Sequence, residues 1–266
     1  MLSQLHMAKS ALYSFQRKMQ VITNNISNAQ TPGYKERRVE MESLFPLIFE
    51  RAVSEFEDDS TQSRTKRKKY IEFGQGVRFV GITKNFRTGT IEVTNRELDM
   101  AIEGNGFFQV RMPDGAVAFS RAGNFHVDSQ GNLLSPNGHP VEPPIRIPLE
   151  AREVIVNQEG RVFALLDDDT RQQEIGQIVV SKFMNPEGLK DIGQNLLLET
   201  ESSGQSEIVV PGQNGAGSIR QRALEFSNVD IVAEMMEMLM CQRSFETIIK
   251  AMKASDDMLK VASDIK

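Results

Sequence analysis

Histidine, cysteine and clustered acidic side chains carry most catalytic and metal chemistry, and their spacing in this sequence fits neither. His6, His126 and His139 lack both the i, i+4 helical spacing and the cysteine partners of a zinc site. The run Asp167-Asp168-Asp169 lacks the glycine and the closing glutamate of a calcium loop, and an acidic turn explains it. We therefore expect no metal site.

The other reactive patterns are also incomplete. Gly104-Asn105-Gly106 begins like a phosphate-binding loop, but Gln109 stands where a third glycine is needed, and no Lys-Ser or Lys-Thr pair follows. Cys241 is the only cysteine, and a small apolar residue inside a helical pattern is a common packing choice. A Gly-x-Ser-x-Gly elbow is missing. We expect neither an enzyme nor a cofactor.

Amide side chains are the polar groups that do cluster. Asn24, Asn25 and Asn28 stand at the end of a helical pattern, and Thr31-Pro32-Gly33-Tyr34-Lys35 follows. Proline removes a backbone donor and moves the preceding residue out of helical geometry, while glycine supplies the turn. The amides can bond the free carbonyls of the last helical turn, or the backbone of a neighbouring subunit. The first use makes a helix stop, and the second makes an assembly contact.

The elements that carry these residues are two helices with a seven-residue apolar repeat. The first seam is Leu5, Ala8, Leu12, Phe15, Met19, Ile22, Ile26 and Ala29. The second is Ile231, Met235, Met238, Gln242, Phe245, Ile249, Met252, Asp256 and Leu259, with two polar interruptions. A seam helix cannot bury its stripe alone, so each end must pack against the other end or against another copy.

Between the helices the pattern changes to short β-prone segments separated by turn signals. The sequence predicts a mixed α and β fold, with long N- and C-terminal helices forming a coiled-coil-like core domain and a central all-β domain inserted between them. The expected parts are an N-terminal helix with its stop (1–35), a charged arm (36–73), the β domain (74–201), a connector with a returning strand (202–226) and a C-terminal helix (227–266).

The charge and hydropathy of the sequence limit which kinds of partner the chain can bind. A net charge of −5 and a pI near 5.4 argue against general binding of nucleic acid, which needs clustered positive charge. The basic run Arg64 to Lys69 follows an acidic cluster, and it is either a patch for an anionic partner or a solvated loop. No apolar run is long enough to insert into a membrane, and polar residues interrupt any cleavable signal at the N-terminus.

The asparagine-rich segment also resembles the N-terminal signature of the bacterial flagellar axial proteins, the rod and hook family. That signature reads Asn-Asn-(aliphatic)-(small)-Asn-x-x-Thr-Pro-Gly-(aromatic)-Lys and matches residues 24–35. The segments Leu98 to Val110 and Ser120 to Phe125 resemble the family's central β domain, and Met240 to Glu246 resembles its closing helix. The resemblance covers nearly the whole chain, although residues 36–73 depart from the family's usual pattern.

This resemblance implies a structural subunit of the flagellar rod, most similar to a distal rod subunit, that polymerises into a helical drive shaft between motor and hook. The alternatives are a proximal rod subunit of similar size and a β-domain binding module on a helical oligomerisation stalk. The implied partners are further copies of the chain, proximal rod proteins, the hook protein, the surrounding ring proteins and the flagellar type III export apparatus. The implied location is the basal body, in the periplasm, reached without a cleaved signal peptide.

The expected assembly interface combines the two seams with the asparagine-rich stop. Its residues are Leu5, Leu12, Phe15, Met19, Ile22, Asn24, Asn25, Ile26, Asn28, Pro32, Gly33, Tyr34, Met235, Met238, Gln242, Arg243, Phe245, Ile249, Met252 and Leu259.

The seam helices should be poorly ordered in the isolated monomer and become ordered on assembly, because an apolar stripe without its partner does not stabilise a helix. Hydrogen exchange on verified monomer measures this, and we expect fast exchange across residues 5–26. Slow exchange there would count against the prediction.

Overall fold

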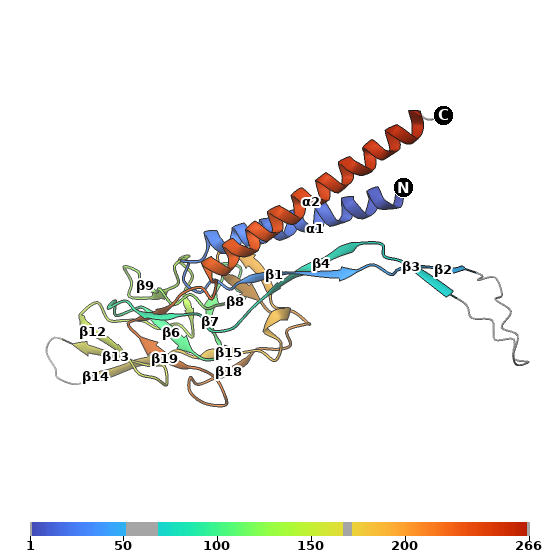
Figure 1. Cartoon of the computed structure of the whole chain (residues 1–266). Helices are drawn as coiled ribbons and strands as arrows, with labels where there is room; N and C mark the ends of the chain where they lie inside the picture. Colours follow the sequence, from blue (N-terminus) through green and yellow to red (C-terminus); the bar gives the residue numbers. More distant parts are fainter. Residues whose placement is uncertain (1, 52–68, 167–171, 265–266) are drawn as a thin grey trace, which may run out of the picture. The chain divides into compact units, whose positions relative to one another are not determined.

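The computed structural model describes residues 2–51, 69–166 and 172–264, so residues 64–68 of the basic run and the acidic triplet 167–169 lie outside the described residues. Over these ranges the chain has a helix near each end and strands between them (Figure 1). The elements close to the helices are α1 (Leu2–Ser27), β1 (Arg37–Ser43), β2 (Leu47–Arg51), β3 (Lys69–Phe73), β4 (Val77–Lys84) and α2 (Ile231–Asp264).

The chain divides into two compact units, which we call the helical unit and the β unit. The helical unit comprises Met1–Thr23, Arg38–Thr83 and Met235–Lys266, and the β unit comprises Asn24–Arg37 and Lys84–Glu234. The last turn of α1 therefore belongs to the β unit, together with the asparagine-rich stop.

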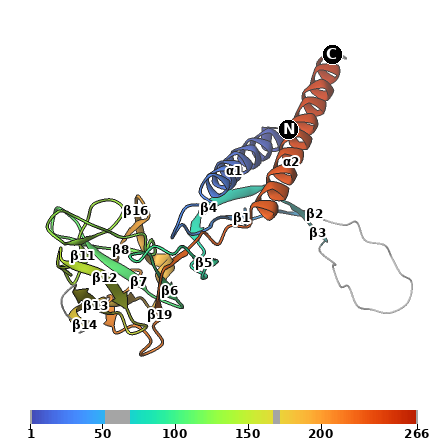
Figure 2. The same cartoon turned by 90° about the vertical axis from the view of Figure 1, so that its left-hand side faces the viewer.

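In the helical unit, α1 and α2 lie side by side (Figures 1 and 2). The Cys241 thiol lies 3.3 Å from the Phe15 carbonyl oxygen, and Lys18 Nζ lies 3.4 Å from a Glu237 carboxylate oxygen. Strands β1 and β4 form a two-stranded ribbon that approaches α1 from another side. A Cβ added at Gly76 would lie 3.2 Å from Ser10 Oγ. Helix α1 therefore shares its buried surface between α2 and the ribbon.

The prediction of a coiled-coil-like core domain is wrong. The described chain has two α-helices and a mostly β centre, and the helices do not bury the predicted seams against each other as a continuous stripe. On α1 the most buried side chains outside the last turn are Ser14, Val21 and Ile22, of which only Ile22 belongs to the seam.

The phase of α2 explains the two polar interruptions. Met235 and Gln242, both in the predicted seam, are exposed, while Glu234 and Cys241, one residue earlier, are buried. Met238, Phe245 and Met252 are half-buried, as both phases allow. Because successive residues of a helix are rotated by about 100°, a shift of one position turns Gln242 outward and brings Cys241 inward.

The β unit consists of antiparallel strands arranged in several small sheets. Its largest sheet has the order β16-β17-β8-β7-β15-β18, with β11 also paired to β7, and a second sheet has the order β12-β13-β14. Two-stranded pairs β19-β6, β20-β5 and β9-β10 complete it.

The strands of the β unit are β5 (Ile91–Val93), β6 (Met100–Glu103), β7 (Phe107–Arg111), β8 (Val117–Ser120), β9 (His126–Val127), β10 (Leu133–Leu134), β11 (Val141–Glu142), β12 (Ala151–Val156), β13 (Arg161–Leu166), β14 (Gln172–Gln177), β15 (Val180–Lys182), β16 (Lys190–Gly193), β17 (Leu196–Leu198), β18 (Glu207–Val209), β19 (Ser218–Gln221) and β20 (Ala223–Glu225). A single 3-10 turn, η1 (Pro186–Gly188), precedes β16.

Strand β7 explains where the core lies. Phe108 points into the main core, where it meets Phe125 edge to face with 5.1 Å between ring centroids. Its neighbour Phe107 points to the opposite face of the sheet and packs with Phe119 and Phe183. Because side chains alternate across a strand, a strand buried on both faces reads as a continuous apolar run in the sequence.

Candidate functional site

The predicted helix stop begins as a helix end that its own amides close. Asn28 Nδ2 donates to the Asn24 carbonyl of the last turn at 2.8 Å, and the Asn28 N–H donates to the same oxygen at 3.2 Å. Asn24 Oδ1 accepts a hydrogen bond of 2.8 Å from the Tyr34 hydroxyl. The stop therefore folds back on the helix that it ends.

Gly33 lets the chain turn from this helix onto the β unit. Its φ is +71°, and its N–H donates to the Glu225 carbonyl at 2.8 Å. A Cβ at this position would lie 2.4 Å from the backbone nitrogen of Ala122, which is too close for any side chain. Both the left-handed backbone and the close approach therefore require glycine here.

Asn25 is the best-connected amide of the cluster, and only 1% of its surface is exposed. Its Nδ2 donates to the Arg37 carbonyl at 2.9 Å and to Glu234 Oε1 at 3.2 Å. Its Oδ1 accepts from the Arg37 N–H at 3.0 Å and from the Tyr34 hydroxyl at 3.1 Å. The amide thus joins the end of α1, the start of β1 and the start of α2 within one chain.

Tyr34 fills the space beneath these amides. Its side chain is buried, and the guanidinium of Arg37 lies over its ring at 5.8 Å from the centroid. Burial raises the pKa of the Tyr34 hydroxyl, against an opposing effect of Arg37, so the hydroxyl keeps its proton and donates it to the asparagine oxygens.

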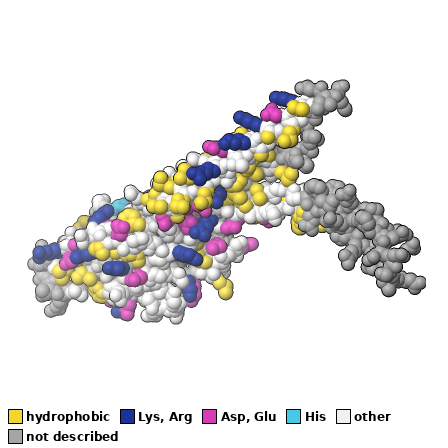
Figure 3. All heavy atoms as spheres, viewed as in Figure 1, with side chains coloured by type: hydrophobic (Ala, Val, Ile, Leu, Met, Phe, Trp, Pro, Cys, Tyr) yellow, Lys and Arg dark blue, Asp and Glu magenta, His cyan; other side chains and the backbone are white. Residues whose placement is uncertain are grey.

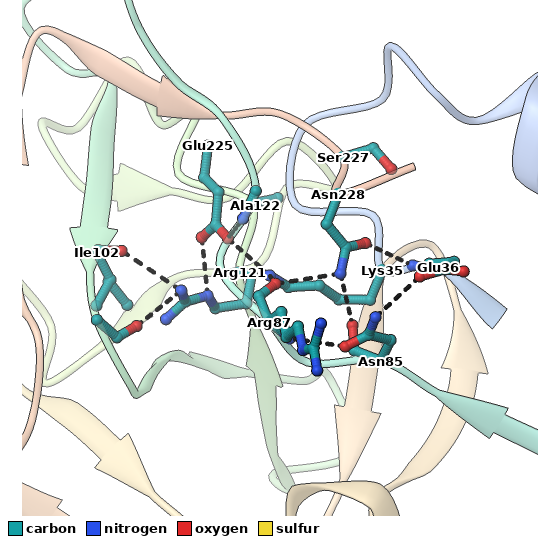
Figure 4. A network of polar contacts seen from close by, with 12 residues as sticks. Lys35, Glu36, Asn85, Arg87, Ile102, Arg121, Ala122, Glu225, Ser227 and Asn228 are labelled. Carbon is teal, nitrogen blue, oxygen red and sulfur yellow. Dashed lines mark hydrogen bonds and ion pairs between the residues drawn. The ribbon is translucent and has the colours of Figure 1, made fainter. Parts of the chain in front are cut away.

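Lys35 and Arg121 enclose the carboxylate of Glu225 (Figure 4). Lys35 Nζ lies 2.6 Å from Glu225 Oε1, and Arg121 Nε lies 2.9 Å from Oε2 as an ion pair without an aligned hydrogen bond. Oε1 also accepts from the Gly89 N–H at 2.9 Å. Lys35 Nζ donates to the Arg87 carbonyl at 2.7 Å. All three charged side chains are buried.

The electrostatics of this triad favour its charged form. Burial by itself would raise the pKa of the Glu225 carboxyl, but Arg121 and Lys35 outweigh burial and hold that pKa below its usual range. Burial lowers the pKa of Lys35, and Glu225 opposes this effect. Arg121 is held in addition by the carbonyls of Gly106 and Gly104, at 2.6 and 2.9 Å. The triad is thus a paired structural cluster with its donors occupied by the protein's own oxygens.

Asn228 ties the return of the chain to the same region. Its Oδ1 accepts from the Glu36 N–H at 2.8 Å, and its Nδ2 donates to the Asn85 carbonyl at 2.8 Å (Figure 4). Asn85 in turn donates from Nδ2 to Glu36 Oε2 at 2.9 Å. The N-terminal cap of α2 is Asp230, whose Oδ1 accepts from the Val232 N–H at 2.9 Å.

Asp191 completes the cluster from strand β16. Its Oδ2 lies 2.6 Å from Arg37 Nη2 and 2.7 Å from Lys84 Nζ, while Oδ1 accepts from the Gly193 N–H at 2.9 Å. Burial would raise the pKa of Asp191, but its hydrogen bond from Lys84 and the nearby positive charges lower it overall. We call Asn25, Tyr34, Lys35, Arg37, Lys84, Arg121, Asp191, Glu225, Asn228 and Glu234 the junction.

The predicted interface residues fall into different environments. Leu12, Phe15, Met19 and Ile26 are half-buried on α1, and Ile22 is buried. On α2, Met235, Gln242 and Arg243 are exposed, and Met238, Phe245, Ile249 and Met252 are half-buried. In the stop, Asn24 is exposed, Asn28 and Pro32 are half-buried, and Asn25, Gly33 and Tyr34 are buried. The side chains of Leu5 and Leu259 lie outside the described residues.

The sequence interpretation missed most charged members of the junction. Arg121 and Glu225 each stand as a single charge within an otherwise apolar or small-residue segment, Ser120 to Ala122 and Leu224 to Phe226. A lone charge in a buried strand needs a partner, so this was an available signal. The pairing itself was not, because Lys35 and Glu225 are far apart in the sequence.

Among the described residues, no group of three or more histidine, cysteine or acidic side chains is placed to hold a metal ion. None of the helices in the described part of the chain is both long and apolar enough to cross a bilayer.

Three family models match the chain, in sequence order. Residues 5–35 match a model described as Flagella basal body rod protein. Residues 101–164 match one described as Flagellar hook protein FlgE/F/G D1 domain, and residues 220–265 match one described as Flagellar basal body rod FlgEFG protein C-terminal. The first match contains the stop, and the last contains Glu225, Asn228 and α2.

Relatives named Flagellar basal-body rod protein FlgG are similar over the whole chain. The protein from Borreliella burgdorferi is 37% identical over 100% of this chain and 99% of its own length. The one from Caulobacter vibrioides is 35% identical over 98% of both chains, and the one from Bacillus subtilis is 33% identical over 100% of both.

Gly33→Ala should destabilise the β unit far more than Gly138→Ala. Both glycines have positive φ, +71° and +80°, so both substitutions carry the strain of about 1–2 kcal/mol that alanine meets in a left-handed backbone. A Cβ at Gly138 meets nothing within 4 Å, whereas one at Gly33 clashes with Ala122. Urea denaturation followed by circular dichroism measures the difference, and equal losses for the two variants would contradict the proposed clash.

Glu225→Gln should lower the free energy of unfolding of the β unit by about 3 kcal/mol at neutral pH, because it leaves two buried cations unpaired. Glu142→Gln, which breaks the exposed pair with Arg111, is the control and should cost under about 1 kcal/mol.

The same pair of variants gives a pH test. The folded pKa of Glu225 is lowered, so its stabilisation is present above the ordinary carboxyl pKa of about 4.3 and is lost as pH falls through the folded value. Wild type should lose stability in this acid range, and Glu225→Gln should lose less. Parallel pH profiles for the two proteins, measured by circular dichroism, would refute this account.

Proposed function

Because this chain belongs to the family of flagellar basal-body rod proteins that includes FlgG, we propose that it is a structural subunit of the distal rod of the bacterial flagellum. Copies of the chain polymerise into a helical tube that transmits torque from the motor to the hook. Repeated contacts that do not close into a ring give an open filament, which is the geometry a shaft needs. The chain works by binding its own copies and not by catalysis.

The observation that carries the self-assembly is an exposed apolar stripe on α2. Met235, Met236, Leu239 and Met240 are all more than half exposed, and residues spaced by four lie next to each other on a helix. Their side is opposite to the line of Met238, Cys241 and Phe245, which is buried or half-buried. Figure 3 shows hydrophobic side chains gathered along the helices. An exposed patch of this kind on one subunit is an association surface.

The composition of the stripe suits repeated contacts between identical subunits. Three of its four residues are methionines, whose flexible side chains adapt to an irregular neighbouring surface. Exposed charges such as Arg243 and Glu246 follow on the same helix and can fix orientation at the rim of a contact. The predicted interface residues Met235, Gln242 and Arg243 are exposed and remain candidates that a neighbouring subunit can reach.

The junction has a different part in the proposal. Asn25, Gly33 and Tyr34 are buried against their own chain, which supports a role within the β unit. The exposed Asn24 keeps its role as an interface candidate.

Family membership implies that the chain assembles into the flagellar basal body with other rod and hook components. The finer partners are part of the proposal: proximal rod proteins below, the hook protein above, the ring proteins around the shaft and the type III apparatus that exports the subunit. The proposed location is the periplasmic part of the rod, reached without a cleaved signal peptide. Support comes from matches to models whose descriptions name both hook and rod proteins.

Leu239→Glu tests the stripe. Its side chain is 56% exposed, so a glutamate should leave the monomer folded and still place a charge inside the subunit contact. We expect electron microscopy of the purified protein to show filaments for wild type and a loss of filaments of at least tenfold for the variant.

Leu149→Glu is the matched control, because Leu149 is 76% exposed on a turn of the β unit and lies away from α2 in the sequence. It should assemble like wild type. Discrete closed particles of the wild-type chain would overturn the rod assignment and favour a binding module on an oligomeric stalk, and unimpaired filaments of Leu239→Glu would remove the stripe from the interface.

A further inference from the structure

The chain passes between its two units at four points, and each of them lies at a residue of the junction or directly beside one. The passages follow Thr23, Arg37, Thr83 and Glu234, so the β unit has its ends at Asn24, Arg37, Lys84 and Glu234. A compact unit can have its chain ends far apart on its surface. Here side chains of the β unit hold all four together.

Asn25 joins three of the four ends. It follows the first end, Asn24, in the sequence, and it exchanges two hydrogen bonds with the backbone of Arg37, the second end. It also donates to the carboxylate of Glu234, the fourth end. Because the amide is buried and both its oxygen and its nitrogen are bonded, replacing it leaves backbone groups of Arg37 without partners.

Asp191 joins the second end to the third. Its Oδ2 contacts both Arg37 Nη2 and Lys84 Nζ, so the segment 38–83 leaves and returns beside one carboxylate oxygen. The three charged groups are partly buried, and hydrogen bonds between charged groups are stronger than neutral ones. Asp191 belongs to β16 and is therefore fixed in the largest sheet.

Arg37 is the element common to both contacts. Asn25 holds its backbone, and Asp191 holds its side chain. A change at Asp191 should therefore be felt at the Arg37 N–H, although Asp191 does not touch that group.

We propose that Asn25 and Asp191 are positioning residues that clamp the four chain ends of the β unit into one mechanical element. The mechanical consequence of the clamp rests on the proposed rod function. When torque loads the β unit through one chain passage, the other three passages share that load. The clamp keeps any single backbone segment from carrying the load alone. It is formed within one subunit and needs no neighbouring copy.

Asp191→Asn tests the clamp in the full-length monomer. Asparagine keeps the oxygen that accepts from the Gly193 N–H, so the turn of β16 is preserved while the charge is lost. We expect hydrogen exchange, read at single amides, to become about tenfold faster at Arg37 and at Asn85, whose N–H donates to the Glu36 carbonyl. Exchange at the core residues Phe108 and Val180 should stay as in wild type.

Glu142→Gln is the control, since it removes a carboxylate that pairs with an arginine of the same unit at 2.7 Å but touches none of the four ends. It should leave exchange at Arg37 and Asn85 unchanged. The double variant with Asn25→Ala should be less than additive at Arg37, because both substitutions release the same residue.

Faster exchange confined to residues 190–193, or strict additivity in the double variant, would overturn the clamp. Lys84→Met is a milder second variant that removes one of the two cations. It should accelerate hydrogen exchange at the Asn85 N–H more than at the Arg37 N–H. Unchanged exchange rates at both amides would also overturn the clamp. These readouts need no filament, so they fail or succeed independently of the rod assignment, which electron microscopy tests.

Discussion

The structure of the β unit depends on one buried carboxylate. Glu225 brings a negative charge into an interior where its desolvation is expensive, and Lys35, Arg121 and the Gly89 N–H compensate for it. The two cations in turn hold carbonyls of Arg87, Gly104 and Gly106. A single charge on β20 thereby fixes the segment after the helix stop, the segment before β5 and the turn between β6 and β7.

This arrangement changes the meaning of the asparagine-rich signature. The position of the signature at the end of an amphipathic helix suggested contacts with a neighbouring subunit. Asn25, Tyr34 and Lys35, however, form hydrogen bonds within their own chain. The signature therefore acts before any neighbour is present. Its residues hold together the points where the chain enters and leaves the β unit.

Local patterns predicted much of this fold, and long-range pairing set the limit. Periodicity identified both helices, proline and glycine marked the stop, and the short β-prone segments predicted that strands fill the sequence between the helices. The family, predicted from residues 24–35 and the central segments, is confirmed by full-length relatives. The heptad phase of α2 was wrong by one position, because Met235 and Cys241 are both acceptable to an apolar pattern and only the neighbouring surface chooses between them. The pairs Lys35–Glu225 and Arg37–Asp191 had no local signal that matched one partner to the other.

The error in the seam carries a physical lesson about α2. A helix that packs on one partner has one apolar face, and a single heptad describes it. Helix α2 has a line of half-buried residues around Cys241 and, opposite to it, the exposed stripe around Leu239. In the sequence, two apolar faces with different phases combine into one imperfect heptad repeat. Polar residues such as Gln242 and Asp256 then interrupt that repeat. Gln242 lies where the two faces meet, between Met238 and Met235 around the helix. A helix of this kind has more apolar surface than one chain covers, while the β unit satisfies its own buried charges, so the demand for further subunits comes from the helix.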